Sequence, residues 1–353
     1  MSSIISGVGS FLPTLRITNQ DFIAHRFYKG IDQPFEDSNE VIIQKFKEIT
    51  GIEERRYAQK EQTNSDLGII AAKNAIAAAN IDVEQLDYII FAHNFGDVRF
   101  ASNHLDMLPA LAARVKHALG IENPNCVAYD MLFGCPGWIE ALIQAHLFIK
   151  AGAAQHCLVI GSETLSRVVD PHDRDSMIFA DGAGACVLSN DPAAKGGILA
   201  HATQTFTKDE AYFLNNGPSL NSKHHIHEKY IKMQGRKIYE FALTKVPQAM
   251  KTALDKSGVG IDEVKKIFIH QANEKMDEAI IDRFYRLHKA QRPEGIMPMN
   301  IQFNGNSSVA TVPTLLDAVV RGEYPEHQLN EGDVIILASV GAGMNINAVV
   351  YRW

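Results

Sequence analysis

The chain has 353 residues, 46% of them hydrophobic, and a formal net charge of −7, so it is long enough to bury a large apolar core. The acidic balance and the lack of a basic tract argue against nucleic acid as a partner. Four cysteines without metal-like spacing argue against a disulfide scaffold and against a metal site. No apolar stretch approaches the 18 residues of a membrane span, and the first residues do not resemble a signal peptide. We therefore expect a cytoplasmic globular protein with no membrane partner.

The first half of the chain alternates strands with helices. Strands are predicted at 4–11, 88–93, 126–132 and 157–161, and helices at 38–49, 66–80, 108–119 and 136–151. Residues 88–93 and 126–132 read as buried strands, and the continuous apolar run at 88–93 is typical of a sheet that is covered on both faces. Between the first strand and residue 60 the sequence is charged and mixed, and its most loop-like part is Asp32–Asp37.

A break rich in turn residues at Ser189–Gly197 separates this half from a second one that repeats the alternation. Strands are predicted at 266–273, 333–339 and 346–352, and helices at 239–256, 277–288 and 313–321. Two successive strand–helix halves, 1–190 and 191–353, indicate an α/β protein. The small residues of Phe179–Ala185 do not have the spacing of a dinucleotide or Walker loop, so they favour close backbone packing.

Cys135 follows a predicted strand and stands where a helix begins, in Phe133-Gly-Cys-Pro-Gly-Trp138. Proline is well placed in a first helical turn, where its missing N–H has no partner to lose. Exposed amides and the helix dipole favour a thiolate at such a position. A buried core thiol is the plain alternative for any single cysteine.

His270 and Asn306 also follow a strand or lie in a polar loop. Alone, either is an ordinary strand-end or turn residue. Together with Cys135 they suit carbon–carbon bond formation from a thioester. The thiolate holds an acyl group, while the neutral imidazole and amide N–H groups stabilise an enolate formed by loss of carbon dioxide. The backbone amides of Cys135 and of the Gly341–Gly343 turn could form an oxyanion hole.

Several motifs in this order resemble the β-ketoacyl-acyl-carrier-protein synthase III group of the thiolase superfamily, over essentially the whole chain. They are Thr50-Gly-Ile-Glu-Glu-Arg, the Cys135 segment, Asp170-Pro-His-Asp-Arg174, Phe179–Ala185, Met233-Gln-Gly235, His270-Gln-Ala-Asn273, Gly305-Asn-Ser-Ser308 with Val312-Pro313, and Gly341-Ala-Gly343. The resemblance implies a five-layered α-β-α-β-α fold of two similar halves, a homodimer, and no permanently bound cofactor.

It also implies a reaction. Cys135 would take an acyl group from coenzyme A or an acyl-carrier protein, and His270 and Asn306 would promote decarboxylation of a malonyl thioester, whose carbanion attacks the acyl-cysteine. Ala342 would complete the oxyanion hole with the amide of Cys135. The resemblance places Arg174, Tyr239 and Asn273 along the binding site of the donor's pantetheine arm.

Three departures from the family pattern affect the donor. The segment Asn19–Glu40 is longer than expected. Lys45 and Ile49 stand where the family's primary enzymes carry a tryptophan and an arginine that sandwich adenine. The Cys135 segment reads Phe-Gly-Cys-Pro-Gly-Trp rather than the commoner Ala-Cys-Ala-Gly-Phe type. These departures indicate a divergent member. The missing tryptophan–arginine pair predicts a preference for carrier-bound or longer acyl groups over acetyl-coenzyme A, with Lys232, Arg236 and Lys237 as candidate contacts for an acidic carrier protein.

Three alternatives stay open from the sequence. The chain could be a superfamily acyltransferase or a non-decarboxylating condensing enzyme, for which Glu163 and Glu140 are candidate bases. It could be a cysteine–histidine–asparagine hydrolase, although the local signatures of that class are absent. It could also be a non-catalytic partner subunit, against which the presence of all three site residues argues.

Overall fold

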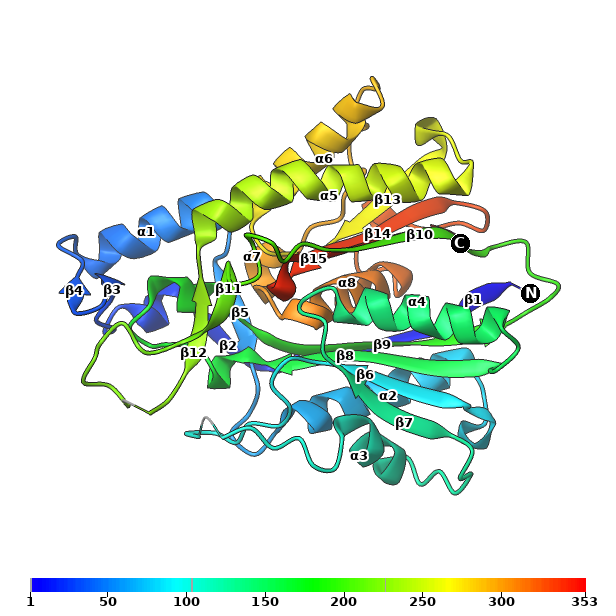
Figure 1. Cartoon of the computed structure of the whole chain (residues 1–353), viewed down its shortest axis with the longest axis horizontal. Coiled ribbons are helices and arrows are strands. Elements are labelled where there is room, and N and C mark those ends of the chain that lie inside the picture. Colours follow the sequence, from blue (N-terminus) through cyan, green and yellow to red (C-terminus); the bar gives the residue numbers. More distant parts are fainter. Residues whose placement is uncertain (1, 103, 226) are drawn as a thin grey trace.

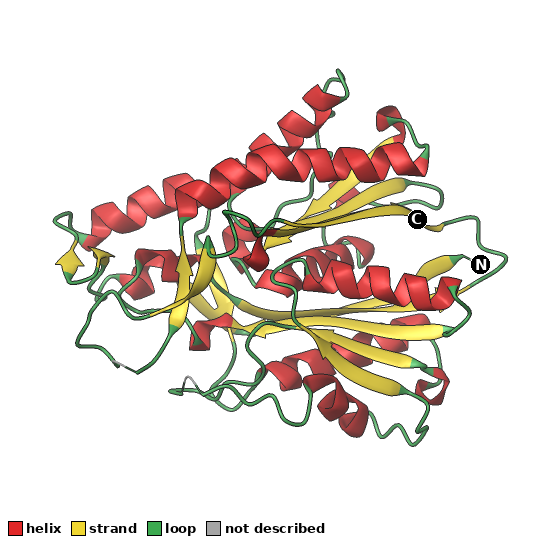
Figure 2. Cartoon of the chain, viewed as in Figure 1, coloured by secondary structure: helices red, strands yellow, loops and turns green. Residues whose placement is uncertain are grey.

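The computed structural model describes residues 2–102, 104–225 and 227–353, which form five layers in the order α-β-α-β-α (Figure 1, Figure 2). The first sheet contains β1 (Ser3–Phe11), β6 (Tyr88–Ala92), β7 (Val127–Met131), β8 (His156–Thr164) and β9 (Asp181–Asn190) in the spatial order β1-β9-β8-β6-β7. The central strand pairs, β8 with β6 and β6 with β7, are parallel, while β9 is antiparallel to both of its neighbours.

The second sheet contains β10 (Gly197–Thr205), β13 (Val264–Ile269), β14 (Val334–Gly341) and β15 (Asn345–Arg352) in the order β10-β15-β14-β13. Only β13 and β14 run parallel, so their carboxyl ends meet at one edge. His270 follows β13, and the Gly341–Gly343 turn follows β14. The fold therefore brings two of the predicted site segments together.

Three layers of helices cover the two sheets (Figure 1). Helices α4 (Gly137–Lys150) and α8 (Thr311–Val320) lie between the sheets, where they share one apolar core with both. Helices α2 (Asn64–Ala79) and α3 (Leu111–Ala118) cover the outside of the first sheet. Helices α5 (Gly235–Ser257) and α6 (Glu274–Leu287) cover the second. Most of α4 is therefore buried, which explains why apolar residues extend over more of its surface than a single stripe.

The small residues of the Phe179–Ala185 motif serve close packing, as predicted. They run into β9, and a methyl group added at Gly184 would lie 2.6 Å from Cβ of Pro313 on α8. Real side chains do not approach that closely, so this crossing of strand and helix requires glycine.

The region between β1 and β6 is more ordered than its charged sequence indicates. It contains β2 (Leu15–Thr18), β3 (Tyr28–Gly30), β4 (Gln33–Pro34), α1 (Asn39–Thr50) and β5 (Glu54–Tyr57). Helix α1 matches the helix predicted at 38–49, with Ser38 at its N-cap and Gly51 in the left-handed conformation at its end (φ 78°).

The remaining elements are short. They are β11 (Leu214–Gly217), β12 (Tyr230–Met233), α7 (Ile301–Asn304), and 3₁₀ turns at Asn19–Phe22, Val83–Gln85, Leu165–Arg167, Arg174–Ile178, Ile261–Glu263, Ser308–Ala310, Pro325–His327 and Ala342–Met344. None of the helices in the described part of the chain has both the length and the apolar character of a membrane span.

One strand differs from its prediction. The run at 126–132 was expected to be a buried strand, yet β7 is the edge of its sheet and pairs only with β6 in the described chain. Val127 and Leu132 are 47% and 57% exposed. An apolar run looks the same on a central strand and on an edge that a partner covers, so the sequence could not separate the two.

Candidate active site

Cys135 lies at the turn between β7 and α4, directly before the N-cap residue Pro136. This turn is in backbone contact with the turn that follows β14. A methyl group on Gly134 would lie 2.7 Å from the amide nitrogen of Ala342, and one on Gly341 would collide with the amide nitrogen of Cys135. Glycine at both positions therefore lets the amides of Cys135 and Ala342 come close together.

Asn345 holds these two turns in register. Its side-chain amide donates to the carbonyl oxygens of Phe133 (3.2 Å) and Ala342 (2.9 Å). Cys135, Ala342 and Ser308 line a cavity of about 190 Å³. Two backbone amides beside a cysteine in one cavity have the arrangement of an oxyanion hole.

The Cys135 thiol does not have the low pKa that its place before a helix predicts. Its pKa is raised to about 11, mainly by burial; the Ser308 hydroxyl lowers the pKa, and the negative charge of Glu163 contributes to raising it. The expectation of a resting thiolate is therefore wrong, because removal from water outweighs the helix terminus. The thiol is protonated at neutral pH and must lose its proton when it reacts.

His270 is held by the second sheet and by α8. Its backbone amide donates to Ala338 of β14 (2.9 Å), and its Nδ1 lies 2.7 Å from the hydroxyl of Thr311. Burial lowers the pKa of His270 to about 4, so the ring is neutral at physiological pH. Thr311 engages Nδ1, which leaves only Nε2 to act on a bound molecule.

Asn306 is fixed by its backbone and by its side-chain oxygen. Its amide donates to Ile178 (2.9 Å), its carbonyl accepts from Ala180 (2.8 Å), and its Oδ1 accepts from the backbone N–H of Ser308 (2.8 Å). This bond sets the orientation of the side-chain amide, because the oxygen points to Ser308 and Nδ2 is left to donate elsewhere. The residue lines a second cavity, described below.

Ser308 joins the three predicted catalytic residues. Its N–H donates to Asn306, its side chain lines the same cavity as Cys135 and lowers the pKa of that thiol, and its carbonyl oxygen lies 3.1 Å from the Thr311 hydroxyl that contacts His270. Its φ of +53° is uncommon for a residue with a side chain and is a form of local strain found at functional sites. The geometry thus connects Cys135 and His270, which are 135 positions apart in the chain.

The second cavity, of about 360 Å³, reaches Asn306 from the region of α1, α5 and α6. All three residues that the resemblance places beside the pantetheine arm line it: Arg174, Tyr239 and Asn273. Tyr239 is 38% exposed, and the Asn273 oxygen caps α6 by accepting from Met276 (3.0 Å). A mostly apolar, partly open cavity with a few polar side chains could hold an extended chain that ends near Asn306.

The cations near this cavity are less available than the sequence indicates. Lys232 is bound to the carboxylates of Asp170 (2.6 Å) and Asp173 (2.9 Å), so it holds the fold together there. Arg236 makes only an exposed pair with Glu240, and Lys237 lies over the ring of Phe213. Of the three candidates for a carrier contact, only Arg236 and Lys237 remain.

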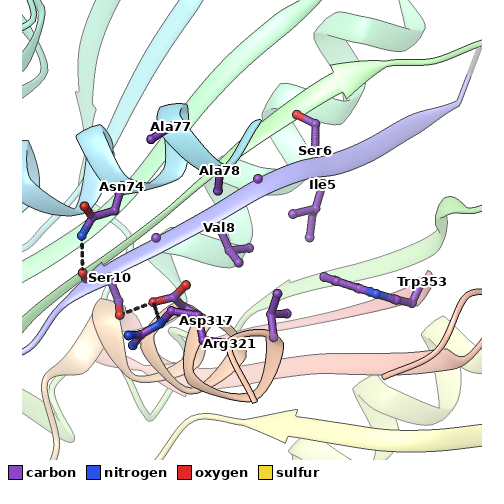
Figure 3. A pocket seen from close by; sticks show the side chains of 13 residues that line it. Ile5, Ser6, Val8, Ser10, Asn74, Ala77, Ala78, Asp317, Arg321 and Trp353 are labelled. Carbon is purple, nitrogen blue, oxygen red and sulfur yellow. Dashed lines mark hydrogen bonds and ion pairs between the residues drawn. The ribbon is translucent and has the colours of Figure 1, made fainter. Parts of the chain in front are cut away.

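A further cavity of about 500 Å³ lies along β1, between α2 and α8 (Figure 3). Its polar groups bind one another: Ser10 and Arg321 both donate to Asp317, and Asn74 donates to the carbonyl of Ser10. Although this cavity is larger than the one at Cys135, the described residues that line it include no cysteine or histidine, and its Asp317 carboxylate is already bound by Arg321.

The two acidic residues named as candidate bases have different surroundings. Glu140 lies on α4 and accepts from Asn347 (2.7 Å) and Thr203 (3.0 Å) of the second sheet, so it is committed to packing. Glu163, at the end of β8, is fully buried behind Asn94 and influences Cys135 by its charge. Neither residue lines the cavity at Cys135.

Sequence reasoning missed four side chains that build the site: Asn94, Ser308, Thr311 and Asn345. Ser308 and Thr311 stand inside or just after the Gly305–Ser308 motif, but only Asn306 drew attention. Their partners lie up to 214 residues away, as for Asn94 and Ser308. Spacing along the chain carries no signal for such contacts.

Solved structures share this fold over the full chain. The crystal structure of 3-oxoacyl-[acyl-carrier-protein] synthase III from Aquifex aeolicus has a TM-score of 0.80 and 32% identity, covering 99% of this chain and 100% of that one. The β-ketoacyl-[acyl carrier protein] synthase III from Thermus thermophilus has a TM-score of 0.81 and 29% identity, covering 99% and 98%. The fold is that of a thiolase-fold condensing acyltransferase.

Sequence comparison narrows this class. Profiles of 3-oxoacyl-[acyl-carrier-protein (ACP)] synthase III and of its C-terminal part match residues 129–206 and 254–353. The β-ketoacyl-[acyl-carrier-protein] synthase III of Sphingopyxis alaskensis is 32% identical, covering 99% of this chain and 98% of the relative. The chain belongs to the 3-oxoacyl-[acyl-carrier-protein] synthase III family. It is a decarboxylative condensing acyltransferase of fatty acid or polyketide-like biosynthesis, as the resemblance predicted.

Proposed function

We propose that Cys135 accepts the acyl group and that His270 and Asn306 stabilise the enolate formed from a malonyl thioester. The observation that carries this assignment is the position of Ser308, which binds Asn306, contacts Thr311 beside His270 and lines one cavity with Cys135. The donor role of His270 requires a proton on Nε2, and therefore requires that the single proton of the Thr311 hydroxyl goes to Nδ1 and not to the carbonyl of Ser308. The amides of Cys135 and Ala342 stabilise the oxyanion of each acyl transfer.

The reaction then proceeds in two stages. The Cys135 sulfur attacks the donor thioester, and the donor thiol leaves. Next, the malonyl thioester binds with its carbonyl oxygen against His270 and Asn306, loses carbon dioxide, and attacks the acyl-cysteine as a carbanion. Neutral donors suit the second stage, because they stabilise the enolate without supplying a base that would hydrolyse the acyl-cysteine.

The key experiment is intact-mass spectrometry of the protein incubated with acyl thioesters. An acyl adduct on Cys135 that disappears when malonyl carrier protein is added, together with carbon dioxide and a β-ketoacyl product, supports the proposal. Absence of any adduct from a panel of acyl-coenzyme A and acyl-carrier donors contradicts it and favours a non-catalytic subunit.

We assign Arg174, Tyr239 and Asn273 to the pantetheine arm of the donor, and we infer a preference for carrier-bound or longer acyl groups over acetyl-coenzyme A. Lys45 is bound to Asp37 (2.9 Å) and does not supply an aromatic face. The guanidinium of Arg174 lies 5.5 Å from the ring of Phe35, which comes from the long segment before α1. One face of Arg174 is therefore already covered by a side chain of the same protein, which disfavours stacking of an adenine there.

We propose that the chain acts as a cytoplasmic homodimer joined through β7. An edge strand with exposed apolar residues is open to pairing with another strand. Val127 on β7 and Leu132 directly after it are 47% and 57% exposed, so this edge carries apolar side chains that a second copy would cover. Light scattering gives the mass directly: a monomer at micromolar concentration contradicts this proposal.

The division into halves at 1–190 and 191–353 also remains a proposal, which the membership of the two sheets supports. Of the other activities considered, no observation favours a non-decarboxylating enzyme, because Glu140 is committed to packing and Glu163 is separated from the cavity by Asn94.

A further inference from the structure

Glu163 has a carboxylate oxygen for which packing gives no reason. Its Oε1 accepts from the side-chain amide of Asn94 (2.6 Å), but its Oε2 is buried and has no hydrogen-bond partner within the described residues. The residue is fully buried at the end of β8. Leaving such an oxygen unpaired is costly, so a native protein keeps it only where it serves some purpose.

The paired oxygen leads to the nucleophile. The Nδ2 of Asn94 has two protons and reaches both Glu163 and the hydroxyl oxygen of Ser308 (3.3 Å). Because an amide nitrogen only donates, the Ser308 oxygen accepts from Asn94 and its own proton is free to point at the sulfur of Cys135. The carboxyl group thus orients, through two side chains, the hydrogen bond that favours the thiolate.

Glu163 also acts on Cys135 by charge. Burial raises the pKa of Glu163 to about 7; His93 and the bonds from Asn94 lower it, and Asp181 raises it. His93 donates to Asp130 and accepts from Gly96. Two acidic groups in one dry site do not readily carry two negative charges. An ionised Glu163 therefore opposes a thiolate at Cys135.

We propose that Glu163 is a positioning residue for Cys135: its carboxyl group holds Asn94 and Ser308 so that they favour the thiolate, and when it is ionised its charge opposes the thiolate. The inference rests on the proposed role of Cys135 as the nucleophile. The reactive state of the cysteine depends on a carboxyl group that touches neither the acyl donor nor the acceptor.

The rate of Cys135 alkylation by iodoacetamide, followed by intact mass from pH 5.5 to 9, tests this inference. Cys126, Cys157 and Cys186 are at most 1% exposed, so the fast label reports Cys135, and Cys135→Ala is the blank. In the wild-type protein the logarithm of the rate should flatten near pH 7, where Glu163 ionises. In Glu163→Gln it should rise tenfold per pH unit throughout, equal to wild type at pH 5.5 and about tenfold faster at pH 8.5.

Ser308→Ala, which removes only the hydroxyl, should be alkylated roughly tenfold more slowly at every pH and should keep the flattening near pH 7. Glu140→Gln, the same substitution at a carboxylate bound to its own partners, should match wild type. A wild-type profile of unit slope through pH 7 overturns the inference without any variant, as does a Glu163→Gln profile parallel to wild type. Condensation by Cys135→Ala would instead overturn the proposed function and leave the thiol measurements unaffected.

Discussion

The inner site around Cys135 and the entrance around Arg174 are held together in different ways. Inside, the contacts that hold the site involve backbone groups: glycines bring two turns into contact, and the main chain of Ser308 binds Asn306 and Thr311. At the entrance, side chains dominate, with Lys232 bound to two aspartates and Phe35 lying over Arg174.

This difference explains what a sequence motif can transmit. A backbone arrangement needs glycine or a short polar residue at fixed positions, so the inner site leaves recognisable strings of letters. Side chains from another segment can form an equivalent arrangement, so the residues at the entrance can differ from the family pattern while the fold stays the same. We expect the largest effects of substitution inside and the smallest at the entrance.

Cys135→Ala should abolish acyl loading, with product formation falling by roughly 10⁴-fold or more, because no other group in the cavity can hold the acyl chain. Loading is measured by intact mass and product by chromatography. Cys157→Ala, at a buried thiol of β8, is the control and should load normally. Condensation by the Cys135 variant would contradict the assignment of Cys135 as the nucleophile and, with it, the comparison of the inner site with the entrance.

His270→Ala and Asn306→Ala should still load Cys135 but should release carbon dioxide from a malonyl thioester about 100- to 1000-fold more slowly, because each loses a preorganised enolate donor. Release of labelled carbon dioxide and the acyl adduct are measured on the same samples. His201→Ala, a histidine on β10, is the control. If both variants lost acyl loading as much as carbon dioxide release, the separate roles of loading and enolate stabilisation would be contradicted.

Acyl loading and decarboxylation should respond differently to pH. Burial raises the pKa of Cys135 to about 11, so the thiolate fraction and the loading rate should rise with pH, overall by about tenfold or more from pH 7 to 9. Burial lowers the pKa of His270 to about 4, so its ring is neutral above about pH 5 and malonyl decarboxylation should stay level from pH 6 to 8. A step in decarboxylation near pH 6.5 would show that His270 titrates like an exposed histidine.

The entrance should show the smallest effects. If the stacking of adenine is lost, coenzyme A binding weakens by about 1–3 kcal/mol, or roughly 5- to 150-fold, so loading from acyl-carrier proteins should exceed loading from acetyl-coenzyme A. Side-by-side loading rates measure this, and acetyl-coenzyme A as the fastest donor would contradict it.

Arg236 and Lys232, both at the entrance, should affect different properties: docking of the carrier protein and stability of the fold. Arg236→Glu should slow loading from the carrier protein a few-fold more than loading from coenzyme A donors, because its side chain is 92% exposed at the rim of the cavity and can meet a protein surface. Lys232→Ala should instead lower the free energy of unfolding by about 2–3 kcal/mol, because it leaves the buried Asp170 without its cation. Urea denaturation and the two loading assays distinguish these outcomes.

The sequence by itself determined the alternation of strands and helices, the two successive halves, and the three residue types of the site. Apolar periodicity, glycine spacing and motif order are local, and they survive as patterns in the letters. Helix α1, the tight packing of Gly184 and the position of Cys135 before α4 all followed from such patterns.

Only the tertiary structure decided what surrounds those residues. Burial reversed the expected pKa shift of Cys135. The folded chain also places Lys232 between two aspartates and puts the strand at 126–132 at the edge of its sheet. It also brought Asn94, Glu163 and Ser308 into one hydrogen-bonded set. Desolvation, charge pairing and sheet order all depend on which distant segments meet, and that information lies in the packing of the whole chain rather than in any stretch of it.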